Sequence, residues 1–255
     1  MDDVEPTGED PWEQHAGWWQ EGFTDGADPE YEEQILPLAA EWLQGADRVL
    51  DVGTGEGQLA RLATKGGAGL VVGVDPTWGQ LTVARERAGG PVYARGGAAG
   101  LPVRSGSFDA VVACLVFEHI VDFAEAIAEV GRVLRPGGRF LFFLNHPLLQ
   151  TPGSGWIDDH ILEEQYWRIG PYLIDDESEE EVAPGVVLPF IHRPLSRYVN
   201  ALVDAGLLIE RMEEPPPPEG FLEKAAEYRE AATIPRLLLL VARKISGEPE
   251  SAGRP

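Results

Sequence analysis

Cysteine is nearly absent from this sequence, and so are long apolar runs. A single cysteine, Cys114, among 255 residues excludes an internal disulfide and is typical of proteins from a reducing compartment. The longest apolar runs, Phe140 to Leu144 and Leu237 to Ala242, are too short to span a bilayer. The N-terminus is acidic and lacks the apolar core of a secretory signal. We therefore expect a soluble, cytoplasmic protein with no membrane partner.

Basic residues are also scarce. The chain has 20 Lys and Arg against 43 Asp and Glu, which gives a formal net charge of −23. Residues 1–33 hold no Lys or Arg, and Arg168 is the only one within residues 158–181. Such a surface repels phosphate backbones, so nucleic acid is not an expected partner. We attribute the charge to solubility and acidic ends, with attraction of a specific cationic ligand as the alternative.

Strand-like and helix-like segments alternate along most of the chain. Short apolar runs predict buried strands, and residues that are apolar every three or four positions predict helices between them. The expected strands are residues 48–53, 70–75, 91–95, 108–117, 139–144, 207–214 and 236–245. This order indicates an α/β fold with a doubly wound, seven-stranded, mostly parallel sheet. The last two strands lack the usual crossover helix between them, which predicts an antiparallel last strand.

The chain is expected to form one domain over residues 12–245, with an N-terminal helical cap over residues 12–45. Residues 1–11 and 246–255 are polar and predict flexible tails. The segment 146–193 is too long for an ordinary connection after the fifth strand, so it predicts a substrate-side insertion or lid.

The turn after the first predicted strand is rich in glycine and reads Asp51-Val52-Gly53-Thr54-Gly55-Glu56-Gly57. Glycines in this position allow a tight turn and let a ligand approach the backbone at the carboxyl ends of the strands. The G-x-G-x-G spacing differs from the dinucleotide-binding G-x-G-x-x-G. Asp51 would repel a pyrophosphate but would suit an ammonium or a sulfonium. Asp75 ends the second strand, where a carboxylate can accept hydrogen bonds from both hydroxyls of a ribose.

Four longer stretches contain and extend this loop: "VLDVGTGEGQLARLA", "VVGVDPTWGQLTVARERA", "LPVRSGSFDAVVACLVFEHI" and "EVGRVLRPGGRFLFFL". Together they resemble successive motifs of the class I S-adenosylmethionine-dependent methyltransferases of the small-molecule type. The resemblance covers roughly residues 35–145. It implies a Rossmann-like methyltransferase fold, S-adenosyl-L-methionine as cofactor and a small-molecule acceptor.

The resemblance also implies which residues contact the cofactor. They belong to the glycine loop and to the ends of the second and fourth strands: Asp51, Gly53, Thr54, Gly55, Gly57, Asp75, Pro76, Thr77, Gln80, Cys114, Leu115 and Val116. Where the family often has an acid for the adenine amino group, this chain has Gly97 followed by Ala98. The backbone at these two residues is therefore expected to contact the adenine.

Methyl transfer from a sulfonium requires alignment and exclusion of water, and it requires a base only where the acceptor is protonated. The ends of the fourth and fifth strands carry no acid pair, so no catalytic metal is expected. His146 directly follows the fifth strand and His192 precedes a predicted helix. Both are candidate catalytic bases, with structural roles as the alternative. His119 is more readily explained by packing or capping.

Aromatic side chains are frequent near the N-terminus and within residues 146–193. The residues predicted to contact the acceptor are Trp18, Trp19, His119, His146, Trp156, Tyr166, Trp167, Tyr172, His192 and Arg193. The alternatives are that the aromatic residues hold a lid on the domain or form a homodimer contact.

The predicted function is methyl transfer from S-adenosylmethionine to a small, partly apolar molecule, at oxygen, nitrogen or carbon. Two alternatives are kept. One is a nicotinamide-dependent oxidoreductase that uses the same glycine loop. The other is a non-catalytic protein that binds S-adenosylmethionine.

Overall fold

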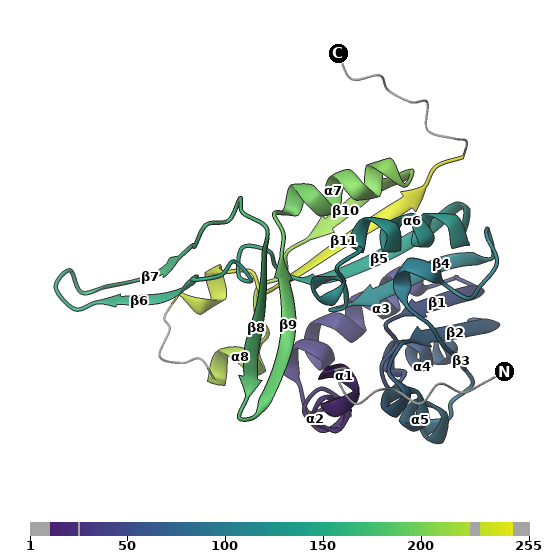
Figure 1. Ribbon diagram of the computed structural model, residues 1–255, viewed down its shortest axis with the longest axis horizontal. Helices are drawn as coiled ribbons and strands as arrows, with labels where there is room; N and C mark the ends of the chain where they lie inside the picture. The colour runs from purple at the N-terminus through teal and green to yellow at the C-terminus, as the bar shows by residue number, and fades with distance from the viewer. Residues whose placement is uncertain (1–10, 25, 225–229, 247–255) are drawn as a thin grey trace, which may run out of the picture.

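A seven-stranded sheet forms the centre of the molecule (Figure 1). The computed structural model describes residues 11–24, 26–224 and 230–246. The strands of the sheet are β1 Arg48–Val52, β2 Leu70–Asp75, β3 Val92–Arg95, β4 Phe108–Cys114, β5 Leu134–Asn145, β10 Leu207–Glu213 and β11 Leu237–Lys244. Their order is β10-β11-β5-β4-β1-β2-β3, and β11 runs antiparallel to both neighbours while the other pairs are parallel. The expected mostly parallel sheet with an antiparallel last strand is confirmed.

Helices cover both faces of this sheet. The helical elements in the described part of the chain are α1 Pro11–Gln14, α2 Ala16–Gly22, η1 Tyr31–Ile35, α3 Leu36–Leu43, α4 Gln58–Lys65, α5 Trp78–Arg87, η2 Ala98–Gly100, η3 Phe117–His119, α6 Phe123–Val133, α7 Leu195–Asp204, α8 Glu219–Lys224 and η4 Ala231–Thr233. Helices α6 and α7 pack on one face, and α3 and α4 pack on the other. Val49 and Leu50 of β1 point to opposite faces, and both side chains are fully buried. Burial on both faces explains why the strands are apolar throughout.

Strand β5 is longer than the sequence predicts. The expected strand begins at residue 139, whereas β5 begins at Leu134, which pairs with Phe108 of β4. Regular pairing resumes at Arg139 after a shift of register, so the Pro-Gly-Gly sequence bends the strand instead of preceding it. The short helix expected near residues 219–231 is α8, and residues 225–229 lie outside the described residues.

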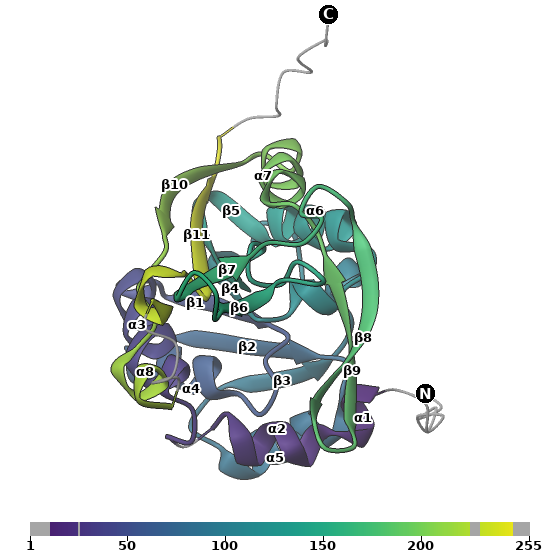
Figure 2. The ribbon, with the colours of Figure 1, turned by 90° about the vertical axis from the view of Figure 1, so that its left-hand side faces the viewer.

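The segment 146–193 contains two separate hairpins. Strands β6 (Gly155–Asp159) and β7 (Glu164–Arg168) form a hairpin that projects away from the rest of the molecule (Figure 1). Strands β8 (Asp176–Ala183) and β9 (Val186–His192) form a longer hairpin that reaches α1 (Figure 2). The two hairpins therefore differ in what they contact: β9 packs against η3 and α1, whereas β6–β7 projects outward.

The N-terminal helices are fixed to the start of α5 by polar side chains. The carboxylate of Glu13 accepts hydrogen bonds from the backbone N–H groups of Trp78 and Gly79, both at 2.7 Å. The amide nitrogen of Gln20 donates to Oε1 of Gln80 at 2.9 Å. The Glu13 bonds satisfy N–H groups that the first turn of a helix leaves unpaired, and with the Gln20 bond they anchor α1 and α2 to α5. Within the described residues, no helix is long and apolar enough to cross a membrane.

Arg193 fixes the chain between β4 and α6. Its guanidinium is buried and donates to the backbone carbonyls of Phe117, Ile120 and Val121 at 3.2, 2.7 and 3.1 Å. It also lies 4.3 Å from the centre of the Phe123 ring. Since these carbonyls lie in a turn, without a sheet partner, Arg193 supplies their hydrogen bonds.

We predict that Arg193→Met lowers the free energy of unfolding by roughly 2–3 kcal/mol, because it removes three hydrogen bonds that a buried guanidinium donates to the backbone. The matched control is Arg197→Met, one turn further along. Arg197 pairs with Asp175 through exposed side chains, so its loss is expected to cost less than about 1 kcal/mol. Urea unfolding of both variants measures the difference, and equal losses would contradict this role of Arg193.

Candidate active site

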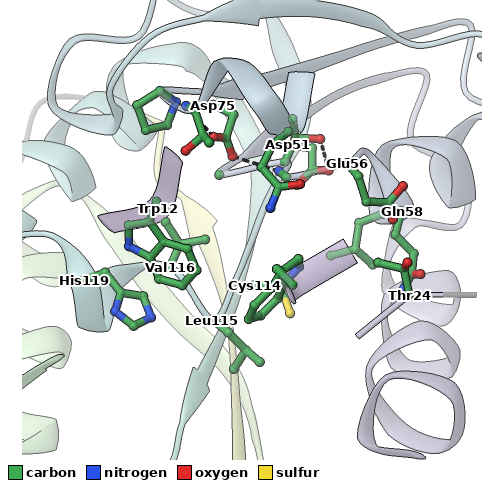
Figure 3. Close-up of a pocket in the computed structure, with 18 of the residues that line it drawn as sticks. Trp12, Thr24, Asp51, Glu56, Gln58, Asp75, Cys114, Leu115, Val116 and His119 are labelled. Carbon is green, nitrogen blue, oxygen red and sulfur yellow. Dashed lines mark hydrogen bonds between the residues drawn. The ribbon is translucent and has the colours of Figure 1, made fainter. Parts of the chain in front are cut away.

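A cavity opens at the carboxyl ends of β1, β2 and β4, beneath α1 and α2 (Figure 3). It holds about 890 Å³ of empty space, including its open mouth, which is the size range of small-molecule sites. We call it the glycine-loop cavity. Its lining consists of Trp12, Trp19, Thr24, Tyr31, Asp51, Gly53, Thr54, Gly55, Glu56, Gln58, Leu59, Asp75, Pro76, Thr77, Gln80, Cys114, Leu115, Val116, His119 and Ile120.

Asp51 is a buried carboxylate in the floor of this cavity. Its Oδ2 accepts hydrogen bonds from the hydroxyl of Thr54 at 2.6 Å and from the backbone N–H of Ala60 at 3.0 Å. Burial raises the pKa of Asp51 to about 7, and the nearby Asp75 and Glu56 add to the effect. In the described part of the chain no cation pairs with it. A buried carboxylate without a cationic partner favours a positively charged ligand.

Asp75 is aimed at the same cavity by two backbone groups. Its Oδ2 accepts from the N–H of Gly55 and its Oδ1 from the N–H of Thr77, both at 2.8 Å (Figure 3). The side chain is 6 % exposed. A carboxylate oxygen accepts more than one hydrogen bond, so this carboxylate is chemically suited to two vicinal hydroxyls as well.

Two glycines of the loop are required for different reasons. Gly53 has φ of 69°, and a Cβ there would collide with the side chain of Val116 after β4. Gly57 has φ of 86° at the start of α4, and a Cβ there would collide with the Tyr93 ring. Gly53 therefore lets the loop lie against the end of β4, whereas Gly57 permits packing beneath the loop.

The end of β4 places a thiol and a phenol together. The Cys114 thiol donates to the Tyr31 hydroxyl oxygen at 3.7 Å, and burial raises the pKa of both groups well above their usual values. Both stay protonated at neutral pH, so the thiol is not a nucleophile here. Leu115, the next residue, has φ of 55°, which is strained for a non-glycine residue.

A second cavity adjoins the first, and we call it the aromatic cavity. Trp12, Trp19, Tyr31, Leu115 and His119 line both. Its remaining lining comes from the N-terminal region, the insertion and the ends of β5 and β11: Trp18, Phe23, Asp28, Glu30, Ile35, Asn145, Gln150, Glu180, Val182, Leu188, Phe190, Arg236 and Leu237. The two cavities thus meet at the end of β4.

His119 stands at this junction. Its ring packs edge-on against Trp12, with ring centres 4.7 Å apart, and against Phe190 at 4.5 Å. Its Nδ1 lies 2.6 Å from the carbonyl oxygen of Pro189, an acceptor, so Nδ1 carries the proton and Nε2 has a lone pair. Burial lowers the pKa of His119, against smaller opposing effects of Glu118 and the Pro189 carbonyl. The ring is therefore neutral at neutral pH.

Comparison with known proteins agrees with this geometry. A methyltransferase domain model matches residues 50–142. The crystal structure of an S-adenosylmethionine-dependent methyltransferase from Mesorhizobium loti is 30% identical in sequence, with a TM-score of 0.70, and the match covers 82% of this chain and 99% of that one. The chain belongs to the S-adenosylmethionine-dependent methyltransferases.

Curated relatives match over a shorter length. An uncharacterized methyltransferase of Mycobacterium tuberculosis is 44% identical over 123 residues, which are 48% of this chain and 49% of that protein. A demethylmenaquinone methyltransferase of Deinococcus radiodurans is 39% identical over 155 residues, which are 56% of this chain and 61% of that protein. The matched part of the chain thus corresponds to about half the length of the first and three fifths of the second.

S-adenosylmethionine is the cofactor of this methyltransferase family, and the glycine-loop cavity fits it on three observations. The buried Asp51 has no cationic partner among the described residues and suits the cofactor's positive groups. Asp75 presents two oriented oxygens, which suit the ribose hydroxyls. The absence of a Cβ at Gly53 keeps the loop against Val116 and leaves its backbone open to the ligand.

The predicted cofactor residues of the methyltransferase lie together, with three exceptions. All of them line the glycine-loop cavity except Gly57, Gly97 and Ala98. Gly57 packs under the loop, and Gly97 precedes η2, which begins at Ala98. A contact of Gly97 and Ala98 with adenine therefore stays a prediction.

The two predicted catalytic histidines lie elsewhere. His146 is 2.8 Å from Glu214 through Nε2, and its Nδ1 accepts from the backbone N–H of Leu148 at 3.2 Å. Nε2 of His192 lies 2.9 Å from the carbonyl oxygen of Tyr172. Neither histidine lines either cavity. Both ring nitrogens of His146 and the Nε2 of His192 form hydrogen bonds within the protein. Their placement does not suit a base that faces the acceptor.

Of the other residues predicted to contact the acceptor, three line a cavity and five do not. Trp18, Trp19 and His119 line the aromatic cavity. Arg193 uses its guanidinium on backbone carbonyls, and the Tyr172 hydroxyl accepts from the N–H of Leu195 at 2.9 Å. On the projecting hairpin Trp156 and Trp167 pack against each other and Tyr166 is exposed. These last five residues, Arg193, Tyr172, Trp156, Trp167 and Tyr166, line neither cavity.

Several lining residues were missed by sequence reasoning. Glu56 lies inside the glycine loop, where its buried carboxylate pairs with Arg61 at 2.6 Å and Arg87 at 2.8 Å. Tyr31 and Trp12 belong to the N-terminal region, whose aromatic content was the available signal. The others missed in the glycine-loop cavity are Thr24, Gln58, Leu59 and Ile120.

We predict that Asp51→Asn changes how the stability of the unliganded methyltransferase depends on pH. The folded pKa of about 7 lies above the ordinary value near 3.8, so this carboxyl's contribution is present at low pH and is lost as the pH rises through about 7. Since one pKa unit corresponds to about 1.36 kcal/mol, the variant should gain roughly 2–3 kcal/mol relative to the wild type between about pH 5 and pH 8. Chemical denaturation of both proteins at the two pH values measures this. A difference that does not depend on pH would contradict the raised pKa.

Proposed function

We propose that the chain transfers a methyl group from S-adenosylmethionine to a small, partly apolar molecule held in the aromatic cavity. The observation that carries the proposal is the shared wall of the two cavities at Trp12, Trp19, Tyr31, Leu115 and His119. A molecule in the aromatic cavity can reach the end of β4 without leaving the protein. The relative named demethylmenaquinone methyltransferase supports an aromatic acceptor, since the walls here are aromatic as well.

When bound, S-adenosylmethionine would supply a methyl group on a positively charged sulfur, and that sulfur would take the electron pair of the broken carbon–sulfur bond. Asp75, Asp51 and the Gly53 backbone would hold the cofactor in the glycine-loop cavity. Alignment of this kind is worth roughly 7–11 kcal/mol in favourable cases. Protonated Cys114 and Tyr31 leave no thiolate or phenolate beside the reacting carbon to compete for the methyl group.

The N-terminal helices and the β8–β9 hairpin together form the cover. Trp12 of α1 and Phe190 of β9 both pack against His119, and α1 contacts β9. Aromatic rings in this arrangement exclude water from the junction of the cavities. We assign the lid function to these two elements, and not to the projecting β6–β7 hairpin.

His119 is the group placed to take a proton from the acceptor. The Pro189 carbonyl holds the tautomer in which Nε2 has a free lone pair, and the lowered pKa keeps the ring neutral. A base near the operating pH contributes about 10²–10⁴-fold in rate where the acceptor must lose a proton. We therefore assign to His119 the role that the sequence suggested for His146 and His192.

We predict that His119→Asn lowers kcat about 10²-fold or more with an acceptor that carries a proton. Asparagine can keep a donor to the Pro189 carbonyl but removes Nε2. The dissociation constant for S-adenosylmethionine should change less than about twofold, since Asp51 and Asp75 are untouched. Transfer of a labelled methyl group across an acceptor panel and calorimetry with the cofactor measure the two quantities.

The control for this variant is His146→Gln, which should keep kcat because His146 bonds to Glu214 outside both cavities. Loss of kcat in His146→Gln and not in His119→Asn would contradict the assignment. Cofactor binding without transfer to any acceptor would favour the alternative of a non-catalytic binding protein.

A further inference from the structure

The inner face of the β8–β9 hairpin carries one acid among apolar neighbours. Side chains alternate along β8, so Ser178 and Glu180 turn toward the protein while Glu179 and Glu181 are exposed. Glu180 pairs across the hairpin with Leu188, which is 1 % exposed. A carboxylate at such a position costs free energy unless something compensates its charge.

No cation of the described residues compensates Glu180. Burial alone raises the pKa of its carboxyl, with no opposing positive charge. The arginine of the same cavity, Arg236, is already paired with Glu30, with Nε and Oε1 2.7 Å apart, and its guanidinium lies 4.1 Å from the centre of the Phe221 ring. Glu180 thus faces the aromatic cavity as an unpaired negative charge.

Two further polar groups of this cavity offer a hydrogen-bond acceptor or a negative charge. The Asn145 amide nitrogen donates to Glu118 at 2.8 Å, which leaves its carbonyl oxygen for the cavity. Asp28 accepts from the backbone N–H of Tyr31 at 3.0 Å and adds a further negative charge. A ligand that brings hydrogen-bond donors and positive charge complements this lining, and an anionic ligand does not.

The walls supply the other requirement for binding an organic cation. Six aromatic rings line the cavity, and they belong to Trp12, Trp18, Trp19, Phe23, Tyr31 and Phe190. The faces of such rings attract ammonium groups by about 0.5–2 kcal/mol, with the larger values where water is excluded. The net charge of −23 on the whole chain draws cations toward it as well.

We propose that the methyl acceptor is an organic amine with an aromatic or apolar body, which enters as an ammonium ion and is anchored by Glu180. This rests on the proposed function, because it names the substrate of the same site. The ammonium gives one proton to Nε2 of His119, which passes it to solvent. The nitrogen lone pair so freed forms the new bond to the methyl carbon, and the methylated product leaves as an ammonium ion.

Phenethylamine and phenethyl alcohol are the matched probes, since they differ in the ammonium and share the ring and chain. Quenching of tryptophan fluorescence reports binding, because Trp12, Trp18 and Trp19 line the cavity. The amine should bind the wild type about tenfold more tightly than the alcohol. In Glu180→Gln this preference should fall to about twofold or less, with alcohol binding unchanged.

The matched control is Glu179→Gln, which removes the same charge from the neighbouring, exposed position of β8 and should keep the preference. Mass spectrometry of the product from labelled S-adenosylmethionine should show a methyl group on the amine nitrogen. Glu180→Gln should raise KM for the amine with little change in the dissociation constant of the cofactor.

Two failures are distinguishable. Equal affinity for the two probes, or an equal effect of Glu180→Gln and Glu179→Gln, overturns the amine assignment and leaves methyl transfer to other acceptors intact. Absence of transfer to every acceptor from cofactor-loaded protein, with the amine preference present, overturns the proposed function.

Discussion

The site depends on one imidazole that three distant parts of the chain share. His119 follows β4, packs against Trp12 of the first helix and Phe190 of the insertion, and donates to the Pro189 carbonyl. These contacts join the N-terminal helices and the β8–β9 hairpin to the end of β4. The Pro189 carbonyl fixes the tautomer of the ring, and burial lowers its pKa. Packing and chemistry therefore arise from the same geometry, and a packing role for His119 does not exclude a catalytic one.

Buried acids in this protein separate into two kinds according to their partners. Glu56 is 1 % exposed and pairs with Arg61 and Arg87, so its charge is compensated inside the protein and it holds the loop to α4 and α5. Asp51 is 2 % exposed and receives hydrogen bonds only from neutral groups. Two acids of the same loop thus differ in function, and the difference lies in the cations around them, not in burial. The comparison gives a physical criterion for distinguishing a structural carboxylate from one that awaits a positively charged ligand.

The sheet and most residues that line the glycine-loop cavity could be predicted because their signals are local. Buried parallel strands are apolar on both faces, and the glycine loop needs glycine where φ is positive, as at Gly53 and Gly57. The proposed role of His119 could not be predicted in this way. The sequence predicts a candidate base at the end of β5, but successive residues of a strand point to opposite faces. Asn145 faces the aromatic cavity, and His146, one residue later, turns to Glu214. A position at the end of a strand fixes the edge of the sheet and leaves the direction of the side chain open.

The insertion shows the same limit on a larger scale. Its length indicates an element of its own, but its aromatic residues do not reveal which of them face a ligand. Trp156 and Trp167 lie opposite each other on β6 and β7, and therefore each covers the other. In β8 the run of acids hides an alternation: Glu179 and Glu181 meet solvent, whereas Glu180 lies across from Leu188 on the covered face. Composition alone assigns all three acids to solubility. Only the cross-strand pairing separates Glu180, which lines the aromatic cavity, from the two exposed acids, and this pairing is the reason for assigning the hairpin to the proposed binding site.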